Sequence, residues 1–273
     1  MDLSSVRVPA GSILCMIITM LLSFLLPIVL CIIWHKKTKS KVYPVFIGAA
    51  TFVVFALILE QILHTVVLKS TGTAITGNIW LYALYGGFAA GIFEETGRFI
   101  AMKFFMKKDL SKESSIMYGI GHGGIEAIII CGFSMISNII ISIMLNAGMG
   151  NLLLTGLTDD MKSTLYTQLA PIETLPSATF LLAGVERIGA VILHIMLSYI
   201  VYKAVAGKKI GYFILAILIH AFVDASTVLL AGNIPNILIE AVLYVYDAVL
   251  LIFIIKLYKS EKVVSSDNLQ AIE

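Results

Sequence analysis

Residues 12–34 read SILCMIITMLLSFLLPIVLCIIW, a stretch of apolar side chains that contains no charged residue. A helix needs about 20 such residues to cross the roughly 30 Å hydrocarbon core of a bilayer. Comparable stretches recur near residues 43–67, 80–106, 115–147, 179–205, 210–231 and 236–258. The sequence therefore predicts an all-α, polytopic transmembrane helical bundle with about seven spans.

The composition agrees with this class of protein. The 273 residues are 59% hydrophobic and 13% charged, whereas soluble domains carry about 25% charged residues. The first stretch is too long for a signal peptide, and basic residues follow it rather than precede it. We expect one integral membrane domain over 1–273 in a cell membrane, with the bilayer as partner and residues 261–273 as a disordered cytoplasmic tail. The net charge of +2 gives no indication of nucleic-acid binding.

The basic residues predict the orientation. Fourteen lysines follow the first, third, fifth and seventh predicted spans: Lys36, Lys37, Lys39, Lys41, Lys103, Lys107, Lys108, Lys112, Lys203, Lys208, Lys209, Lys256, Lys259 and Lys262. The alternate side carries only Arg7, Lys69 and Lys162. By the positive-inside rule, the N-terminus is outside and the C-terminus is cytoplasmic. On the outer side, 148–178 is the one long loop, and 161–169 within it is predicted to form a short interfacial helix.

Ionisable residues inside the predicted spans are the candidates for function. A charge at the bilayer centre costs at least about 2.5–3.5 kcal/mol, so these groups must face one another, a metal ion or water. Thirteen candidates lie within the spans: Glu60, His64, Glu94, Glu95, Arg98, His122, Glu126, Glu186, Arg187, His194, His220, Asp224 and Asp247.

Helical spacing and depth bring several of them together. Residues four apart share a helix face, as in Glu94/Arg98, His122/Glu126 and His220/Asp224. Glu95 points about 100° away from Glu94, so one glutamate can pair with Arg98 while the other enters a cavity. Glu95, His122, His194 and His220 all lie about 12–17 Å from the cytoplasmic ends of their spans. We therefore predict one shared site near the middle of the membrane.

Imidazole and carboxylate donors in a dry site are typical of Zn²⁺. The candidate metal ligands are His122, His194, His220 and Asp224, the last either as a ligand or as a partner of His220. Three protein ligands leave one position for a water molecule, whose pKa then falls to near 7. Glu95, or alternatively Glu94, is the candidate general base, and Arg98 would fix the glutamate pair or stabilise an oxyanion.

Each of these residues also has a structural interpretation. Glu94 and Arg98 can form an intrahelical ion pair, and any single histidine can be a hydrogen-bonded structural residue. Supporting roles are expected for three further residues, which would orient histidines or pair with one another: Glu126, Glu186 and Arg187. Peripheral structural roles are expected for Glu60, His64 and Asp247. The glycines of 119–124 are predicted to permit close helix approach around His122.

The motifs resemble those of a known family. Phe93–Arg98 reads FEETGR, 118–126 reads YGIGHGGIE, Glu186–Arg187 precede His194, and 220–224 reads HAFVD. Together these resemble the bacterial YhfC family of intramembrane metalloproteases, which is related to the CAAX-protease and bacteriocin-processing (CPBP) superfamily. The resemblance covers about 80–231, the predicted core that carries the protease-like motifs.

The larger group has the signature E-E-x-x-x-R, F-x-x-x-H and H-x-x-x-N/D on successive membrane helices. The resemblance implies that Glu94 or Glu95 is the catalytic glutamate and that His122 and His220 belong to the site. Arg98 is one residue closer to the glutamates than the signature requires, which leaves open which of the two is catalytic.

Two other positions also differ from the signature. Tyr118 stands where the larger group has phenylalanine. His194, with Glu186, lies on an additional motif associated with YhfC itself.

The leading hypothesis is an intramembrane metallopeptidase, a hydrolase with Zn²⁺ as cofactor. Its substrate would be a membrane-associated peptide or protein that enters from the bilayer or the cytoplasmic side. A transporter for a cation or small solute is one alternative, although the chain shows no internal repeats of the transporter kind. A non-catalytic membrane scaffold is another, because the same superfamily includes a γ-secretase subunit of that kind.

Overall fold

The computed structural model describes residues 3–270, and the side chains as far as Ser260, as helices without a β-strand. The chain divides into two compact units. One comprises Met1–Ile28 with Glu126–Ile188, and the other Val29–Ile125 with Gly189–Glu273. Each unit has its own apolar core. The predicted core of 80–231 contributes to both units, and the interpretation of 1–273 as a single domain remains a prediction.

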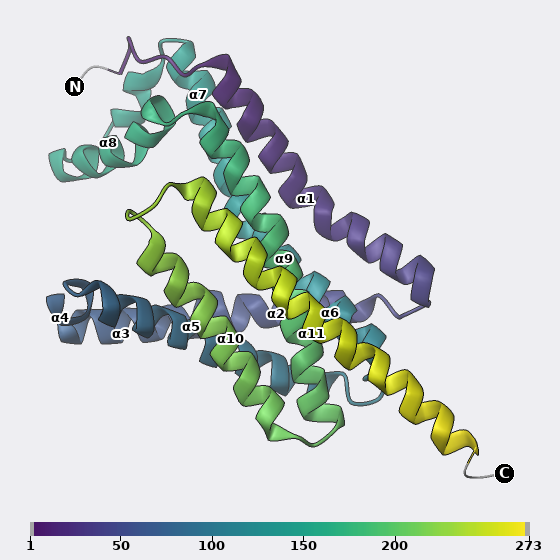
Figure 1. The fold of residues 1–273 in the computed structure, drawn as a ribbon. Helices are drawn as coiled ribbons and strands as arrows, with labels where there is room; N and C mark the ends of the chain where they lie inside the picture. The colour runs from purple at the N-terminus through teal and green to yellow at the C-terminus, as the bar shows by residue number, and fades with distance from the viewer. Residues whose placement is uncertain (1–2, 271–273) are drawn as a thin grey trace. The chain divides into compact units, whose positions relative to one another are not determined.

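The helices follow one another with short connections, as Figure 1 shows. In chain order they are α1 (Ala10–Thr38), α2 (Tyr43–Phe52), the π-helical η1 (Val53–Glu60), α3 (Gln61–Thr71), α4 (Thr73–Thr76), α5 (Ile79–Ile100), the π-helical η2 (Ala101–Phe105), α6 (Lys112–Glu126), the π-helical η3 (Ala127–Gly132), α7 (Phe133–Asn146), the 3₁₀ turn η4 (Gly150–Leu154), α8 (Asp159–Thr174), α9 (Ser177–Ala206), α10 (Ile210–Leu230) and α11 (Asn236–Gln270).

Six helical stretches of the described chain are long and apolar enough to cross a membrane. They are Ala10–Thr38, Tyr43–Thr71, Lys112–Asn146, Ser177–Ala206, Ile210–Leu230 and Asn236–Ser260. The predicted all-α, polytopic fold is therefore confirmed. The predicted span at 80–106 corresponds to α5 and η2, which is not one of the six and carries Glu94, Glu95 and Arg98. The count of seven spans and the orientation of the termini remain predictions.

In the unit that contains α5 and α10, these two helices pack directly against each other (Figure 1). Gly87 and Gly91, one turn apart on α5, face the backbone of α10 at Ala221 and Ile217. A Cβ atom on Gly91 would lie 2.8 Å from the Ile217 carbonyl oxygen. Small residues at this spacing let membrane helices approach closely, which brings polar side chains of α5 within reach of those on α10.

Two glycines of α6 that precede His122 also permit close helix approach, one toward α9 and the other toward α2. A Cβ atom on Gly119 would lie 2.6 Å from the Cα atom of Ile195 on α9. A Cβ atom on Gly121 would collide with the carbonyl group of Val45 on α2. The predicted role of this glycine run in close helix approach is confirmed.

In the other unit, the short helix predicted within the long loop is α8. The Thr158 side chain caps it by accepting a hydrogen bond from the backbone N–H of Met161, and Asp159 and Asp160 occupy its first turn. Leu169 and Ile172 are buried in the core of that unit. A helix is therefore present where one was predicted, at Asp159–Thr174, and its interfacial location remains a prediction.

The C-terminal helix α11 extends through the first part of the predicted tail. Residues 261–270 continue the α11 backbone, and 271–273 lie outside the described residues. The disordered tail at 261–273 therefore remains a prediction.

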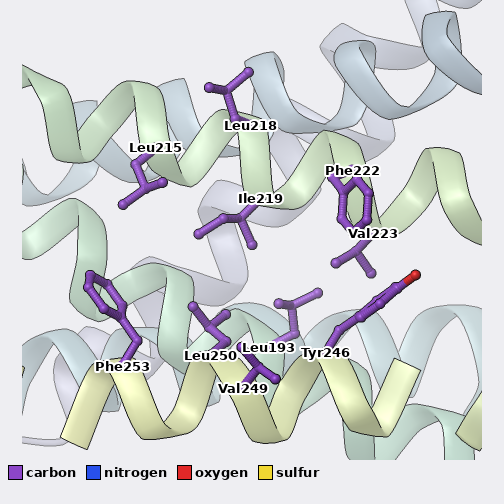
Figure 2. A pocket seen from close by; sticks show the side chains of 10 residues that line it. All are labelled: Leu193, Leu215, Leu218, Ile219, Phe222, Val223, Tyr246, Val249, Leu250 and Phe253. Carbon is purple, nitrogen blue, oxygen red and sulfur yellow. The ribbon is translucent and has the colours of Figure 1, made fainter. Parts of the chain in front are cut away.

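An apolar groove of about 510 Å³ lies between α10 and α11 (Figure 2). Leu193 of α9 and Leu250 of α11 are the buried residues of its lining. Ile219 and Val223 of α10 also line it. Leu193, Ile219 and Val223 each directly precede one of the polar residues His194, His220 and Asp224. Because successive helix residues are about 100° apart, α9 and α10 present an apolar face to the groove and a polar face elsewhere.

Candidate metal centre

Three helices of one unit place two imidazoles and a carboxylate together. Glu94 lies on α5, His122 on α6 and His194 on α9. Each offers one ligand atom, and these three atoms all lie within 4.8 Å of one another. Glu94 Oε2 is 2.8 Å from His122 Nε2 and 3.8 Å from His194 Nδ1. All three residues are buried, so bulk water does not form hydrogen bonds with these ligand atoms.

Arg98 holds the backbone and ring of His194. Its Nη1 donates to the His194 carbonyl oxygen at 2.8 Å and to Ser198 Oγ at 3.0 Å. Its Nη2 lies 3.1 Å from His194 Nδ1. A guanidinium group only donates hydrogen bonds, so His194 Nδ1 is an acceptor and its lone pair points toward Arg98 and Glu94.

A second polar group lies beside the first. His220 Nδ1 is 2.9 Å from Glu95 Oε1, and His220 Nε2 is 3.5 Å from Asp224 Oδ2. The second carboxylate oxygen of Glu95 lies 3.3 Å from Arg98 Nε. Glu95 is fully buried, whereas the Asp224 side chain is 37% exposed. His220 thus bridges a buried carboxylate and a partly exposed one.

The imidazole rings form a continuous row. The ring centroids of His122 and His194 are 5.0 Å apart, and those of His194 and His220 are 5.4 Å apart. Phe52 of α2 packs edge-on against His122 at 5.3 Å. The sequence prediction did not include Phe52 or Ser198. Ser198 could have been found from the sequence, because it is a polar residue four positions after His194 in an apolar span. Phe52 could not, because nothing distinguishes it from many other apolar residues.

The structure therefore brings together the predicted site residues of the third to sixth spans: Glu94, Glu95, Arg98, His122, His194, His220 and Asp224. Within this set, Glu94, His122 and His194 form a group that could hold a metal ion, and ligation by His220 and Asp224 remains a prediction. Arg98, expected to share a helix face with Glu94, forms its ion pair with Glu95 instead. Residues three apart also share a helix face, so both spacings permit a pair and the packing of α5 selects one.

The predicted supporting residues Glu126, Glu186 and Arg187 belong to the other unit. Arg187 Nη1 donates to Glu126 Oε1 at 2.8 Å, and the Arg187 guanidinium also contacts the Glu186 carboxylate. Of the two predicted roles, pairing with Arg187 is the one these contacts match.

The predicted peripheral residues make local contacts within the unit that holds the histidines. His64 Nε2 is 3.1 Å from Glu60 Oε1, and His64 Nδ1 is 2.8 Å from the Tyr85 hydroxyl group of α5. Asp247 of α11 is buried close to Gly189 of α9. His64 thus joins the second predicted span to α5, and the peripheral structural role of Glu60, His64 and Asp247 remains a prediction.

The residues present fit a divalent metal ion. Two imidazoles and one carboxylate are the protein ligands of one established class of catalytic zinc site. The Glu94 carboxylate is buried together with both imidazoles, and a buried charge is costly unless it is paired. A divalent cation would neutralise that carboxylate and accept a lone pair from each imidazole.

Comparison with known proteins assigns the chain to a family. The family model described as YhfC intramembrane metalloprotease matches residues 22–244. The chain belongs to the YhfC family. It is 38% identical over 211 residues to the protein described as "Uncharacterized membrane protein YhfC" of Bacillus subtilis (strain 168), and the match covers 76% of this chain and 81% of the relative.

No solved structure gives a significant match. Membership of the YhfC family confirms the resemblance inferred from the motifs. Together with the six apolar helices, it identifies the chain as an integral membrane protein, and the family description indicates an intramembrane metalloprotease.

Proposed function

We propose that this chain is an intramembrane metallopeptidase whose metal ion is held by Glu94, His122 and His194. The observation that carries the proposal is the convergence of their three ligand atoms within 4.8 Å, in a buried position on helices α5, α6 and α9. Zn²⁺ is the metal that best matches two imidazoles and a carboxylate. When bound, it would polarise a peptide carbonyl group and lower the pKa of a water molecule.

The remaining residues would orient groups and transfer protons. Glu95 lies 2.9 Å from His220 Nδ1, and Asp224 lies 3.5 Å from His220 Nε2. In the neutral form that donates Nδ1–H to Glu95, His220 would accept a proton from the attacking water at Nε2 and return it to the leaving amine. Glu95, the base expected from the sequence, would act through His220, because its other oxygen pairs with Arg98.

Arg98 would keep His194 in place. Its hydrogen bonds to the His194 carbonyl oxygen and to Ser198 fix the helix backbone from which the ring projects. In the metal-bound protein, ligation through His194 Nδ1 would replace the hydrogen bond from Arg98 Nη2, and the other two bonds would retain the arginine.

The burial of the site restricts the class of substrate. Glu94, His122 and His194 are almost completely buried, and the helical stretches that carry His122 and His194 are apolar enough to cross a membrane. A substrate bond must therefore enter among membrane helices. This favours a peptide or protein segment that is itself associated with the membrane.

Metal analysis of the purified full chain tests the ligand set. The chain has five histidines, so each can be replaced by alanine in turn. We expect His122→Ala and His194→Ala to lose near-stoichiometric metal, measured by inductively coupled plasma mass spectrometry. His35→Ala and His64→Ala are matched controls, which should retain it.

His220→Ala separates the two possible ligand sets. We expect this variant to keep its metal but to lose cleavage of membrane-inserted peptides, because His220 would transfer protons rather than bind the ion. Loss of metal from His220→Ala would restore the three-histidine set expected from the sequence. Wild-type protein that binds no metal and cleaves no peptide, in a screen of membrane-inserted peptides, would reject the proposal altogether.

A further inference from the structure

A second pocket, of about 530 Å³, lies at the ends of α5 and α9 that carry many of the chain's lysines. It lies between η2 and the loop that follows it on one side, and the turn from α9 to α10 on the other. All of these segments belong to the same unit. On the predicted topology, the pocket opens at the cytoplasmic surface of the membrane.

The lining combines positive charge with apolar surface. Three lysines contribute to it, namely Lys103, Lys107 and Lys208, and no carboxylate does. The remaining lining residues are apolar and include Phe99 and Met102. Three ammonium groups without a counter-charge around an apolar floor are complementary to a molecule that has an anionic head and a hydrocarbon tail.

The nearby acidic residue is already engaged elsewhere. The Asp109 carboxylate accepts from Lys41 Nζ at 2.8 Å and from the Tyr43 hydroxyl group at 3.2 Å. Asp109 is therefore held by groups outside the pocket lining. The ammonium groups of the pocket lysines can therefore contact an anionic ligand.

Three further features concern the lysines and the positive charge at the pocket. Lys103 Nζ lies 5.5 Å from the centre of the Phe99 ring of the lining and 5.4 Å from that of the exposed Phe104. Lys208 has φ +51°, a left-handed backbone conformation that is uncommon for a residue other than glycine. Helix α10 starts two residues later, at Ile210, without a side-chain cap, so the positive end of its dipole also lies at the pocket.

We propose that this pocket binds the phosphate headgroup and the upper acyl chain of an anionic phospholipid. The lysines would contact the phosphate, and the acyl chain would lie against Phe99, Met102 and Leu110. The inference does not depend on the proposed peptidase activity. It would make anionic lipid a specific ligand at the ends of α5 and α9, the helices that carry Arg98 and His194.

Native mass spectrometry of the detergent-solubilised full chain tests this proposal. The probes are phosphatidylglycerol and phosphatidylcholine with identical acyl chains. We expect phosphatidylglycerol to bind at least about tenfold more tightly, since each lysine near an anionic surface contributes about 1 kcal/mol. The triple variant with glutamine at Lys103, Lys107 and Lys208 should lose this preference.

A matched triple variant, with glutamine at Lys36, Lys37 and Lys259, should keep the preference. Equal loss in both triple variants would overturn the proposal in favour of general surface charge. A wild-type protein that binds both lipids equally would also overturn it.

Further experiments, with a variant and with soluble competitors, identify what occupies the pocket. Val205→Trp keeps all three lysines and narrows the apolar part, so it should weaken phosphatidylglycerol binding. Glycerol phosphate at millimolar concentration should not displace the lipid; displacement would indicate a soluble phosphate ligand instead. Displacement by a soluble acidic peptide would indicate a peptide-docking site and would also overturn the lipid assignment.

Discussion

At the scale of single residues, Arg98 links the two polar groups of the site. It pairs with Glu95, which holds His220, and it donates to the carbonyl and ring of His194. Its guanidinium is completely buried, so each of these contacts replaces hydration that the side chain has lost. A lysine has no planar fork of donors and cannot make the same set of bonds.

Replacement of Arg98 should therefore destabilise the protein. We expect Arg98→Ala to lower the free energy of unfolding by about 3–5 kcal/mol, because it leaves the Glu95 carboxylate buried without its cation. Arg98→Lys should recover part of the loss. Thermal unfolding in detergent, followed by circular dichroism, measures both.

The exposed Lys37→Ala serves as the control for this series and should unfold like the wild type. If Arg98→Ala also unfolded like the wild type, the bonds of Arg98 would not contribute to stability.

The sequence does not decide which of the adjacent residues Glu94 and Glu95 faces which neighbouring helix. The sequence places them about 100° apart, but it does not say which direction faces which helix. In the folded protein, Glu94 faces His122 of α6, and Glu95 faces His220 of α10. Only the rotation of α5 against its neighbours separates a candidate metal ligand from a positioning carboxylate.

At the scale of elements, glycines set the distance between the helices that carry the site. Gly87 and Gly91 bring α5 against α10, and Gly119 and Gly121 bring α6 against α9 and α2. Without a hydrophobic driving force between helices in lipid, such close packing is a main source of association. The site geometry therefore depends on residues that contribute no side-chain chemistry.

Gly86 and Gly87 offer a matched test of this dependence. A Cβ atom on Gly87 would collide with the Ala221 carbonyl oxygen, whereas one on Gly86 would meet nothing within 4 Å. We expect Gly87→Ala to destabilise the protein by about 1–3 kcal/mol through overpacking. Gly86→Ala should be neutral or stabilising by up to about 1 kcal/mol, since alanine is the better helix former.

Thermal unfolding of the two variants, together with their metal content, checks the comparison. We expect Gly87→Ala to lower the unfolding temperature, and Gly86→Ala to keep both properties of the wild type. Equal behaviour of the two variants would mean that the contact between α5 and α10 tolerates a methyl group.

At the scale of the whole molecule, the open issue is whether α5 crosses the membrane. Six other helical stretches are long and apolar enough to do so, but α5 carries two glutamates and an arginine. Buried partners neutralise these charges, and the first fifteen residues of α5, Ile79–Phe93, carry none. An odd number of spans places the two termini on opposite sides of the membrane, and an even number places them on the same side.

Cysteine labelling decides between these topologies. In a background with Cys15, Cys31 and Cys131 replaced by alanine, single cysteines are introduced at Ala74, before α5, and at Lys108, after η2. We expect a membrane-impermeant maleimide to label position 74 in intact cells and position 108 only after permeabilisation. Labelling of both positions from the outside would show that α5 does not cross.

The sequence by itself determined the helical membrane class, the candidate spans and the residues of the polar cluster. It could do so because hydropathy over about 20 residues and the cost of charge in lipid are local properties, readable from composition and spacing. Motifs such as FEETGR and HAFVD added the family and the class of activity proposed here, because they place given residue types at fixed intervals along one helix.

Only the tertiary structure decided how the cluster is divided. It grouped Glu94 with His122 and His194, set His220 against Glu95, and placed Arg187 with Glu126 in another unit. These choices depend on helix rotation and on contacts between residues about 30 to more than 100 positions apart. Periodicity along one helix carries no information about which neighbouring helix each face will meet.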